Sequence, residues 1–372
     1  MENSEIYLLL KENCHKFNYK HLYHIIKQLK NYNYILLGES THGTEEYYLI
    51  RLAITIIMVN DFGFNTILFE TEWSMGYKLN LFIHSKLDED IKHILNNFNI
   101  YPKWMYYNEY IMILLLFLKK WNETHSKKVF FYGIDCQNVE LAKKNICNEK
   151  NINCKIIKDI IINYDKMKNS KNYWNIRDTF WLHIIETIKK QRSSKFILWA
   201  HNSHIGNVKA NKMIGNKINI GYLLDKSYKS YKIGFSTYQG TVKASKDWDN
   251  PGRKYILKPS REDSFEYIFH LITQNMNISS IIYNCNPSLK IDKLFRYVGV
   301  VYDSQNELNA HYQLTNINKE FDIIIFIDNT NFLKQLDKTK KTKTTKKTKT
   351  HKKTKTLTEF YKYSKKVIGN IK

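Results

Sequence analysis

Short apolar runs of strand length recur along the chain, and most of them end at a glycine, a carboxylate or a histidine. The runs occupy residues 34–37, 65–69, 129–132, 196–200, 232–235, 281–283 and 323–327. They are rich in β-branched and aromatic side chains and do not alternate apolar with polar positions, which is typical of strands covered on both faces. The pattern therefore predicts an α/β fold with a mainly parallel central sheet flanked by helices.

Longer stretches between these runs have apolar residues at helical spacing. Residues 45–60 form one such stretch, which stops before Asp61-Phe62-Gly63. The stretches at about 75–125 and 139–190 are longer than a simple crossover between parallel strands requires. We therefore expect them to add a helical region beside the sheet, within one α/β domain that spans residues 1–335.

The last part of the chain, residues 336–372, differs in composition. Residues 338–356 are almost only lysine and threonine, so they bury no apolar surface and are predicted to be disordered. Ten lysines fall here, and the formal net charge of +23 leaves +13 (23 minus 10) for the rest of the chain. Two interpretations stay open: weak binding of nucleic acid or another polyanion through phosphate contacts, or a solvated tail without a partner.

Cysteine usage and hydropathy predict a cytoplasmic protein. The five cysteines are scattered without a CxxC pair, which indicates reduced thiols rather than a disulfide framework. The apolar residues 6–10 are followed at once by Lys11 and Glu12, so they do not form a signal peptide. Residues 111–118 are too short to span a membrane, which needs about 20 residues. We expect no membrane partner.

Histidines and carboxylates follow four of the predicted strands directly. They are Glu39 and His42 after residues 34–37, Glu70 and Glu72 after 65–69, Asp135 after 129–132, and His201 and His204 after 196–200. Because the carboxyl ends of parallel strands share one edge of a sheet, and ligands bind at that edge, we expect these side chains to line one cleft.

Several imidazoles and carboxylates in one cleft suit hydrolysis. A neutral histidine is a general base near pH 7, and a carboxylate on its far nitrogen fixes the ring. The same residue types also bind zinc or iron, so a divalent metal held by His42, Glu70, His201 and His204 is an open alternative. The sequence has no HExxH, GxSxG, P-loop or strand-linked GxGxxG motif. Ser40 and Ser203 lie beside histidines, where a serine is a nucleophile or merely a turn cap.

Each candidate also has a purely structural interpretation. Glu39 would cap the helix that begins near Thr44. Glu70 would form an ion pair with Arg51, and His201 and His204 would be packed core residues. Glu72 and Asp135 are weaker candidates, for substrate binding or for ordering the site.

The segment from Leu37 to Arg51, LGESTHGTEEYYLIR, resembles the opening signature of the erythromycin esterase family. Further segments resemble the family in the same order along residues 30–330, outside the lysine- and threonine-rich tail. They are Phe69-Glu70, Trp199-Ala200-His201-Asn202-Ser203-His204, Arg296-Tyr297-Val298-Gly299-Val300-Val301-Tyr302, and Phe321-Asp322.

The resemblance implies an α/β core with an added helical region and hydrolysis of a lactone ester, as in the macrolides. It implies that a histidine activates water without a bound metal or other cofactor. By motif position, His42 matches the general base, Glu39 and Glu70 the essential carboxylates, and Arg51 the family's arginine. His201 and His204 match a second histidine pair.

The leading hypothesis is a hydrolase of a small-molecule carboxylic ester or lactone, in which His42 removes a proton from water. The first alternative is a metal-dependent hydrolase that uses the same residues. The second is a non-catalytic polyanion-binding protein on an idle hydrolase fold.

Overall fold

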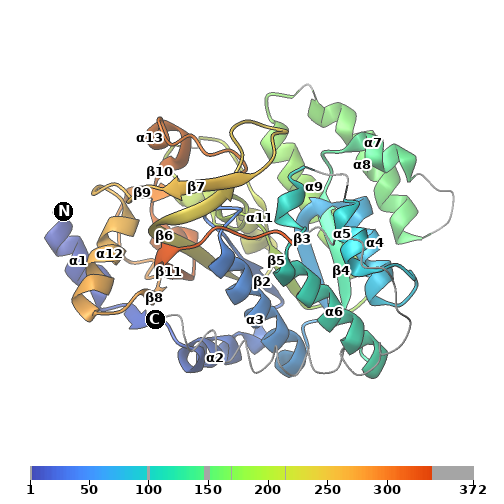
Figure 1. The fold of residues 1–372 in the computed structure, drawn as a ribbon, viewed down its shortest axis with the longest axis horizontal. Helices are drawn as coiled ribbons and strands as arrows, with labels where there is room; N and C mark the ends of the chain where they lie inside the picture. Colours follow the sequence, from blue (N-terminus) through green and yellow to red (C-terminus); the bar gives the residue numbers. More distant parts are fainter. Residues whose placement is uncertain (1, 99–100, 146–150, 169, 214, 337–372) are drawn as a thin grey trace, which may run out of the picture.

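The computed structural model describes residues 2–98, 101–145, 151–168, 170–213 and 215–336. The lysine- and threonine-rich tract at 338–356 lies outside these residues, and so do the predictions made for it. The folded part is built on one large sheet with helices against both faces (Figure 1).

The centre of the sheet is parallel, in the order β11-β6-β2-β5-β3-β4. These strands are β2 (Tyr34–Leu37), β3 (Thr66–Glu72), β4 (Phe130–Asp135), β5 (Phe196–Trp199), β6 (Ser230–Ala244) and β11 (Ile323–Thr330). Antiparallel strands extend it: β8 (Ser280–Asn284) pairs with β11, β1 (Cys14–Lys16) with β8, and β7 (Arg253–Leu257) with β6. The predicted mainly parallel α/β sheet is confirmed.

Successive side chains of the central strands enter two separate cores. Ile35 and Leu37 belong to one core, and Tyr34 and Leu36 belong to the other. The first core is covered by α2 (Tyr19–Gln28), α3 (Glu45–Phe62) and α6 (Glu109–Thr124). The second is covered by α1 (Asn3–Lys11), α8 (Ile152–Lys168), α9 (Tyr173–Gln191), α11 (Ile220–Ser227) and α12 (Phe265–Met276). Burial on both faces explains the continuous apolar runs.

The helix predicted at 45–60 is α3, which ends at Gly63. Gly63 has a left-handed φ of 70°, and its N–H donates to the carbonyl of Met58, which closes the last turn. The helix is apolar almost all round because it is sandwiched between the sheet and the helices α2 and α6.

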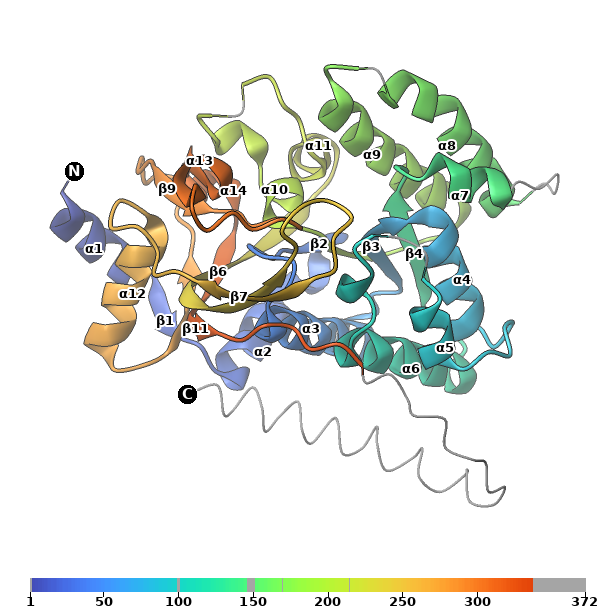
Figure 2. The same ribbon diagram turned by 45° about the horizontal axis from the view of Figure 1, so that its top comes forward.

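The two long stretches at about 75–125 and 139–190, which were expected to form an added helical region, contain helices at the β3–β4 end of the sheet (Figures 1 and 2). They are α4 (Trp73–Ile83), α5 (Ile91–Asn96) and α6 in the first stretch, and α7 (Val139–Lys144), α8 and α9 in the second. The helices α1 and α12 lie at the opposite end. The boundary of the α/β domain at residue 335 stays a prediction.

Several strands differ from the sequence prediction. β3 and β4 continue through Glu72 and Asp135, and β6 is far longer than residues 232–235. β1, β7 and the separate pair β9 (Lys293–Arg296) and β10 (Tyr312–Thr315) were not predicted, because they are short or have polar residues at many positions. The remaining short helices are α10 (Asn202–Ile205), α13 (Glu307–His311) and α14 (Ile317–Glu320).

The expectation of reduced cysteines is wrong at Cys154. Cys154 is disulfide-bonded, whereas Cys14, Cys136 and Cys285 are free thiols. In the part of the chain that the structure describes, no helix combines the length and the apolar character needed to cross a membrane.

Candidate active site

The segment after β2 places a histidine, a carboxylate and an arginine in one buried chain of contacts. His42 Nδ1 lies 2.8 Å from Glu39 Oε1, and Arg51 Nη2 donates to Glu39 Oε2 at 2.5 Å. Because an ionised carboxylate only accepts, Nδ1 of His42 carries the proton and Nε2 is left with its lone pair. Among the described residues, no group bonds to that Nε2. His42 therefore has the tautomer that a general base requires.

The groups around His42 and Arg51 determine the pKa of the His42 ring. The guanidinium carbon of Arg51 lies 4.6 Å from the ring centres of both Tyr48 and Trp199. Burial alone would lower the pKa of His42, but the hydrogen bond and the charge of Glu39 raise it above the usual value. The ring is thus held ready to accept a proton in a site almost closed to water.

The loop itself is held by backbone contacts that explain its two glycines. A Cβ on Gly43 would lie 1.9 Å from the carbonyl oxygen of Lys243 on β6, and one on Gly38 would meet Asn202. The carbonyl of Glu39 accepts from the N–H of Asn202 at 2.9 Å. Side chains at the glycine positions would push this loop off the sheet, so only glycine allows the approach.

A second histidine, His201, lies at the end of β5 beside the first. Its ring centre is 4.8 Å from that of His42, and its backbone N–H donates to Glu70 Oε2 at 2.8 Å. Its Nδ1 accepts from the N–H of Ser203 at 3.3 Å and contacts the Ser203 hydroxyl at 2.7 Å. Since Nδ1 accepts, the ring proton is on Nε2, which lies 3.4 Å from the carbonyl of Ser40.

Burial and the charge of His42 lower the pKa of His201 to about 3. His201 is therefore neutral near pH 7 and presents an N–H donor beside the base. The two histidines have opposite states: Nε2 of His42 accepts a proton, and Nε2 of His201 donates a hydrogen bond.

Glu70 joins the two halves of the site. Burial would raise the pKa of Glu70, but charge interactions with His204, His42 and Arg177 and the hydrogen bond from the backbone N–H of His201 lower it to about 2. Arg177 Nη2 lies 3.3 Å from Glu70 Oε1, and the hydroxyl of Tyr106 donates to the Glu70 carbonyl at 2.7 Å. Glu70 is thus a fixed negative charge between His201 and Arg177.

The helix α9 supplies two residues that the strand-end analysis did not find. Asp178 accepts from Nδ1 of His204 at 3.0 Å, and Arg177 Nη1 donates to Nε2 of the same ring at 3.2 Å. Trp174 lies flat against the ring, with centres 4.3 Å apart. His204 is thereby locked between a carboxylate and a guanidinium. In the sequence, Arg177 and Asp178 are two ordinary charges inside a helix, so no motif signals them.

The weaker candidates Asp135 and Glu72 lie on the far side of Arg177. Arg177 donates to both oxygens of Asp135, at 3.0 and 2.7 Å. Burial opposes the ionisation of Asp135, but this ion pair lowers its pKa. Burial and the charge of Asp135 raise the pKa of Glu72 to about 8. Glu72 Oε1 accepts the N–H groups of Gln137 and Asn138, each at 3.1 Å.

All eight candidate residues thus lie along the carboxyl edge of β2, β5, β3 and β4. Their contacts differ from those that the purely structural interpretations predicted. Arg51 pairs with Glu39 rather than with Glu70, whose cation is Arg177. Glu39 does not cap α3, whose first turn has no side-chain cap. His201 and His204 are buried, but each is bonded to polar groups.

The ligand set proposed for a metal is not assembled. Among the described residues, no three or more His, Cys, Asp and Glu side chains are arranged to hold a metal ion. Both ring nitrogens of His204 are already bonded, one of them to the cationic Arg177. A guanidinium pointing at the donor atom repels a metal ion, so these residues do not fit the metal-dependent alternative.

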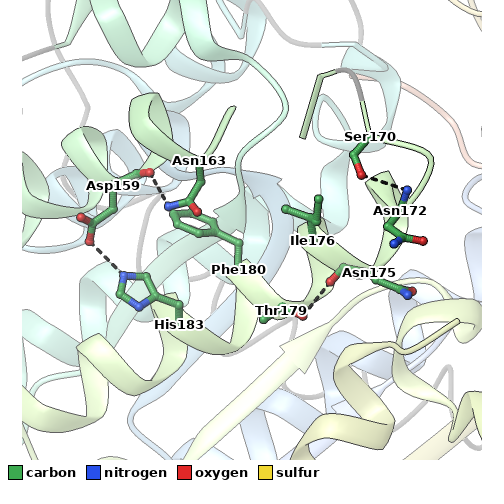
Figure 3. Close-up of a pocket in the computed structure, with 9 residues that line it drawn as sticks. All are labelled: Asp159, Asn163, Ser170, Asn172, Asn175, Ile176, Thr179, Phe180 and His183. Atoms are coloured by element: carbon green, nitrogen blue, oxygen red, sulfur yellow. Dashed lines mark hydrogen bonds and ion pairs between the residues drawn. The ribbon is translucent and has the colours of Figure 1, made fainter. Parts of the chain in front are cut away.

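Two cavities lie near the helical region. One, of about 500 Å³, opens between α8 and α9, where Asp159 pairs with His183, and it contains none of the candidate residues (Figure 3). The other, of about 440 Å³, is lined by Glu72 and Asp135, together with Tyr106. Through Asp135 and Tyr106 it adjoins the cluster around Glu70, so this one of the two cavities is next to the candidate site.

Comparisons with known proteins show what the chain is similar to. The chain is 31% identical over 102 residues to "Erythromycin esterase type II" of Escherichia coli, a match that covers 27% of this chain and 23% of that relative. The match therefore spans about a quarter of the length of the relative.

Solved structures show the same fold at low identity. A succinoglycan biosynthesis protein is 17% identical, with a TM-score of 0.70 over 89% of this chain and 98% of that one. A protein from Bacillus cereus is also 17% identical, with a TM-score of 0.70 over 91% and 100%. A histidine mutant of the erythromycin esterase EreC, in its open conformation, is 14% identical, with a TM-score of 0.60 over 87% and 99%.

The sequence model of the family described as erythromycin esterase matches residues 59–149 and 147–330. These ranges contain Glu70, Arg177, His201 and His204, and they begin after the loop that contains His42. Together the matched ranges cover well over half of the chain, so this protein belongs to the erythromycin esterase family.

Proposed function

We propose that this protein hydrolyses a carboxylic ester or lactone of a small molecule, with His42 as the general base and water as the nucleophile. The observation that carries the proposal is the pair of neighbouring rings of His42 and His201, which are in opposite hydrogen-bonding states. Glu39 bonds to Nδ1 of the first ring, and the N–H of Ser203 donates to Nδ1 of the second. Membership of the erythromycin esterase family supports the reaction class.

The reaction begins when Nε2 of His42 takes a proton from water as the water oxygen attacks the carbonyl carbon. Glu39 stabilises the imidazolium that forms, since its carboxylate already accepts from Nδ1. The tetrahedral oxyanion replaces the Ser40 carbonyl, 3.4 Å away, as the acceptor of Nε2–H of His201, which needs no change of charge to donate. The intermediate then collapses, and the leaving alkoxide takes the proton back from His42. The products are a carboxylic acid and an alcohol.

Other charged residues position these two rings. Arg51 has its charge matched by Glu39 and is stacked between aromatic rings, so it orders the base rather than touching substrate. Arg177 and Glu70 fix the histidines at the end of β5. The proposal needs no metal, because water is activated by His42 and the oxyanion by a neutral donor.

The test is hydrolysis of a panel of esters and lactones, including a macrolide, by the wild-type protein and by His42→Ala. Loss of a general base costs about 10²–10⁴-fold in rate. The matched control is His93→Ala, because His93 lies in α5, exposed to solvent, with its ring bonded to Asn97 only. Turnover that survives in His42→Ala would refute the assignment of the base, and a loss in His93→Ala would show that the effect is not local.

A further inference from the structure

The cavity next to the site has walls suited to a positive charge. Five aromatic side chains line it: Tyr101, Tyr106, Tyr164, Tyr173 and Trp248. Four carboxylates share the lining, namely Glu72, Asp135, Glu140 and Asp249, against one lysine, Lys168. Aromatic faces attract cations through the negative charge of the ring face, and carboxylates add a direct charge. Such walls disfavour a carboxylate or a phosphate ligand.

The charges in this cavity are only partly neutralised by the protein. Asp135 is matched by Arg177, and Glu140 lies 2.9 Å from Lys143 at the surface. Glu72 has no cation bonded to it in the described chain, and it accepts only backbone N–H groups. Burial and Asp135 make its ionisation unfavourable, as its raised pKa of about 8 indicates. A bound cation would relieve this cost.

Two aromatic residues of the cavity lining pack on each other, and one of them is exposed to solvent. Trp248 is 59% exposed, and its ring packs edge to face on Tyr101 with centres 5.3 Å apart. A large indole of a cavity lining that is left in water is a typical contact surface for a ligand. The hydroxyl of Tyr101 is held by Ser245 at 2.6 Å, so the pair has a fixed base.

We propose that this cavity binds an alkylammonium group of the ester or lactone substrate. This inference rests on the proposed hydrolase function and specifies its substrate class. The cation would contact Trp248 and the tyrosine faces, with Glu72 and Asp249 as counter-charges.

The sheet sets the distance between that cation and the bond to be cleaved. The base follows β2, and the cavity lies at the ends of β3 and β4, which are two and three strands away in the order β2-β5-β3-β4. Neighbouring strands are about 4.8 Å apart, so the cavity carboxylates on β3 and β4 lie ~10–14 Å from the end of β2, where the base follows. The substrate should therefore carry its ammonium group on a long linker rather than next to the ester.

Direct binding tests the cavity without requiring catalysis. Choline and its uncharged shape analogue 3,3-dimethylbutan-1-ol are titrated into the full-length protein by calorimetry. Choline should bind roughly five- to thirtyfold more tightly, the range of a partly buried cation–aromatic contact. The preference should shrink in Asp249→Asn and in Trp248→Leu, and it should persist in Asp159→Asn, the same change in the cavity of Figure 3. Equal binding of the two compounds would overturn the proposal.

Proton release gives a second readout at Glu72. Choline should displace a proton near pH 7, when Glu72 ionises beside it, and buffers of different ionisation enthalpy measure that proton. The groups facing Glu72 are Asp135, Arg177, Tyr106, Tyr173 and Cys136. Of these, Asp135 and Arg177 stay charged throughout, so Glu72→Gln should abolish the release. Release that persists in Glu72→Gln would exclude Glu72 as the counter-charge.

Kinetics then separate the two proposals. Acetate esters with linkers of two, six and ten carbons are compared, each ending in a trimethylammonium or a tert-butyl group. The ratio of kcat/KM for charged to neutral esters should rise with linker length. Hydrolysis without any charge preference would leave the hydrolase standing and refute the cavity assignment. A choline preference without hydrolysis of any ester would support the cavity assignment and refute the proposed hydrolase function.

Discussion

Replacing Glu39 by glutamine tests whether this carboxylate fixes the His42 ring as a base. In the native site one oxygen accepts from His42 and the other accepts from Arg51. Glutamine has nearly the same shape but only one acceptor oxygen, and its NH2 group is a donor. If the oxygen stays with Arg51, the NH2 group faces Nδ1 of His42. The ring must then move its proton to Nε2, the atom that should accept a proton from water.

Two effects set the size of the loss. A hydrogen bond to a charged group contributes about 1.5–3 kcal/mol, which is ~10–150-fold in rate. An amide in place of the carboxylate behind a catalytic histidine costs up to about 10⁴-fold when it imposes the wrong tautomer. We therefore expect kcat/KM of Glu39→Gln to fall by about 10²–10⁴-fold.

The pH profile changes in a defined direction. Wild-type activity should fall at acid pH, as His42 is protonated below its raised pKa. Without the charge of Glu39, burial and Arg51 both favour the neutral ring, so the pKa of His42 falls. The acid limb of kcat/KM should therefore move to lower pH in the variant, while the maximal rate drops.

The assay is kcat/KM from pH 5 to 9 on the best ester of the panel, with a thermal melt of each protein. Glu46→Gln is the control, since Glu46 lies at the start of the same helix and bonds only to the exposed Asn331. A folded Glu39→Gln protein with a rate within threefold of wild type, or with its acid limb shifted upward, would refute the reasoning.

Three further substitutions probe the rest of the site. Arg177→Met leaves the buried carboxylates of Asp135 and Glu70 without their cation. Urea denaturation should show that the free energy of unfolding falls by about 3–5 kcal/mol, and a fall of less than about 1 kcal/mol would contradict the pairing. Asp178→Leu removes the acceptor that orients His204, so kcat should fall about tenfold or more, with KM less affected. Ser203→Ala removes one of two bonds to Nδ1 of His201, so kcat/KM should fall by no more than about tenfold if water is the nucleophile, whereas a larger loss together with an acyl-enzyme burst in the wild-type protein would make this serine the nucleophile.

The central strands were predictable because they are buried on both faces. Residues 34–37 and 196–200 have no polar position, and this pattern identifies β2 and β5 from the sequence. β6 was found only in part, because its apolar start is followed by Ser236, Thr237, Gln239 and Gly240, which belong to neither of the two apolar cores. β3 was expected to end at Glu70, since charged residues normally mark a strand end, yet it continues to Glu72 beside β4.

The candidate residues were predictable because position along a parallel strand determines position in space. Residues that follow β2, β5, β3 and β4 share one edge whatever the order of the strands. The order itself was not predictable, and it decides the contacts. Because β5 lies between β2 and β3, His201 is placed between His42 and Glu70, and Arg51 is left to pair with Glu39.

The contribution of α9 follows a different physical rule from that of the strands. Arg177 and Asp178 are neighbours on a helix, about 100° apart around its axis, yet they bond to the two opposite nitrogens of His204. Both bonds form because α9 crosses the ends of the strands with the ring of His204 packed against it. Tertiary packing, rather than a local sequence pattern, determines where α9 crosses. The strand-end loops supply the reactive groups, and the added helices supply the charges that hold them. A change in the helical region can therefore alter the electrostatics of Glu70 and His204 while every strand-end motif stays intact.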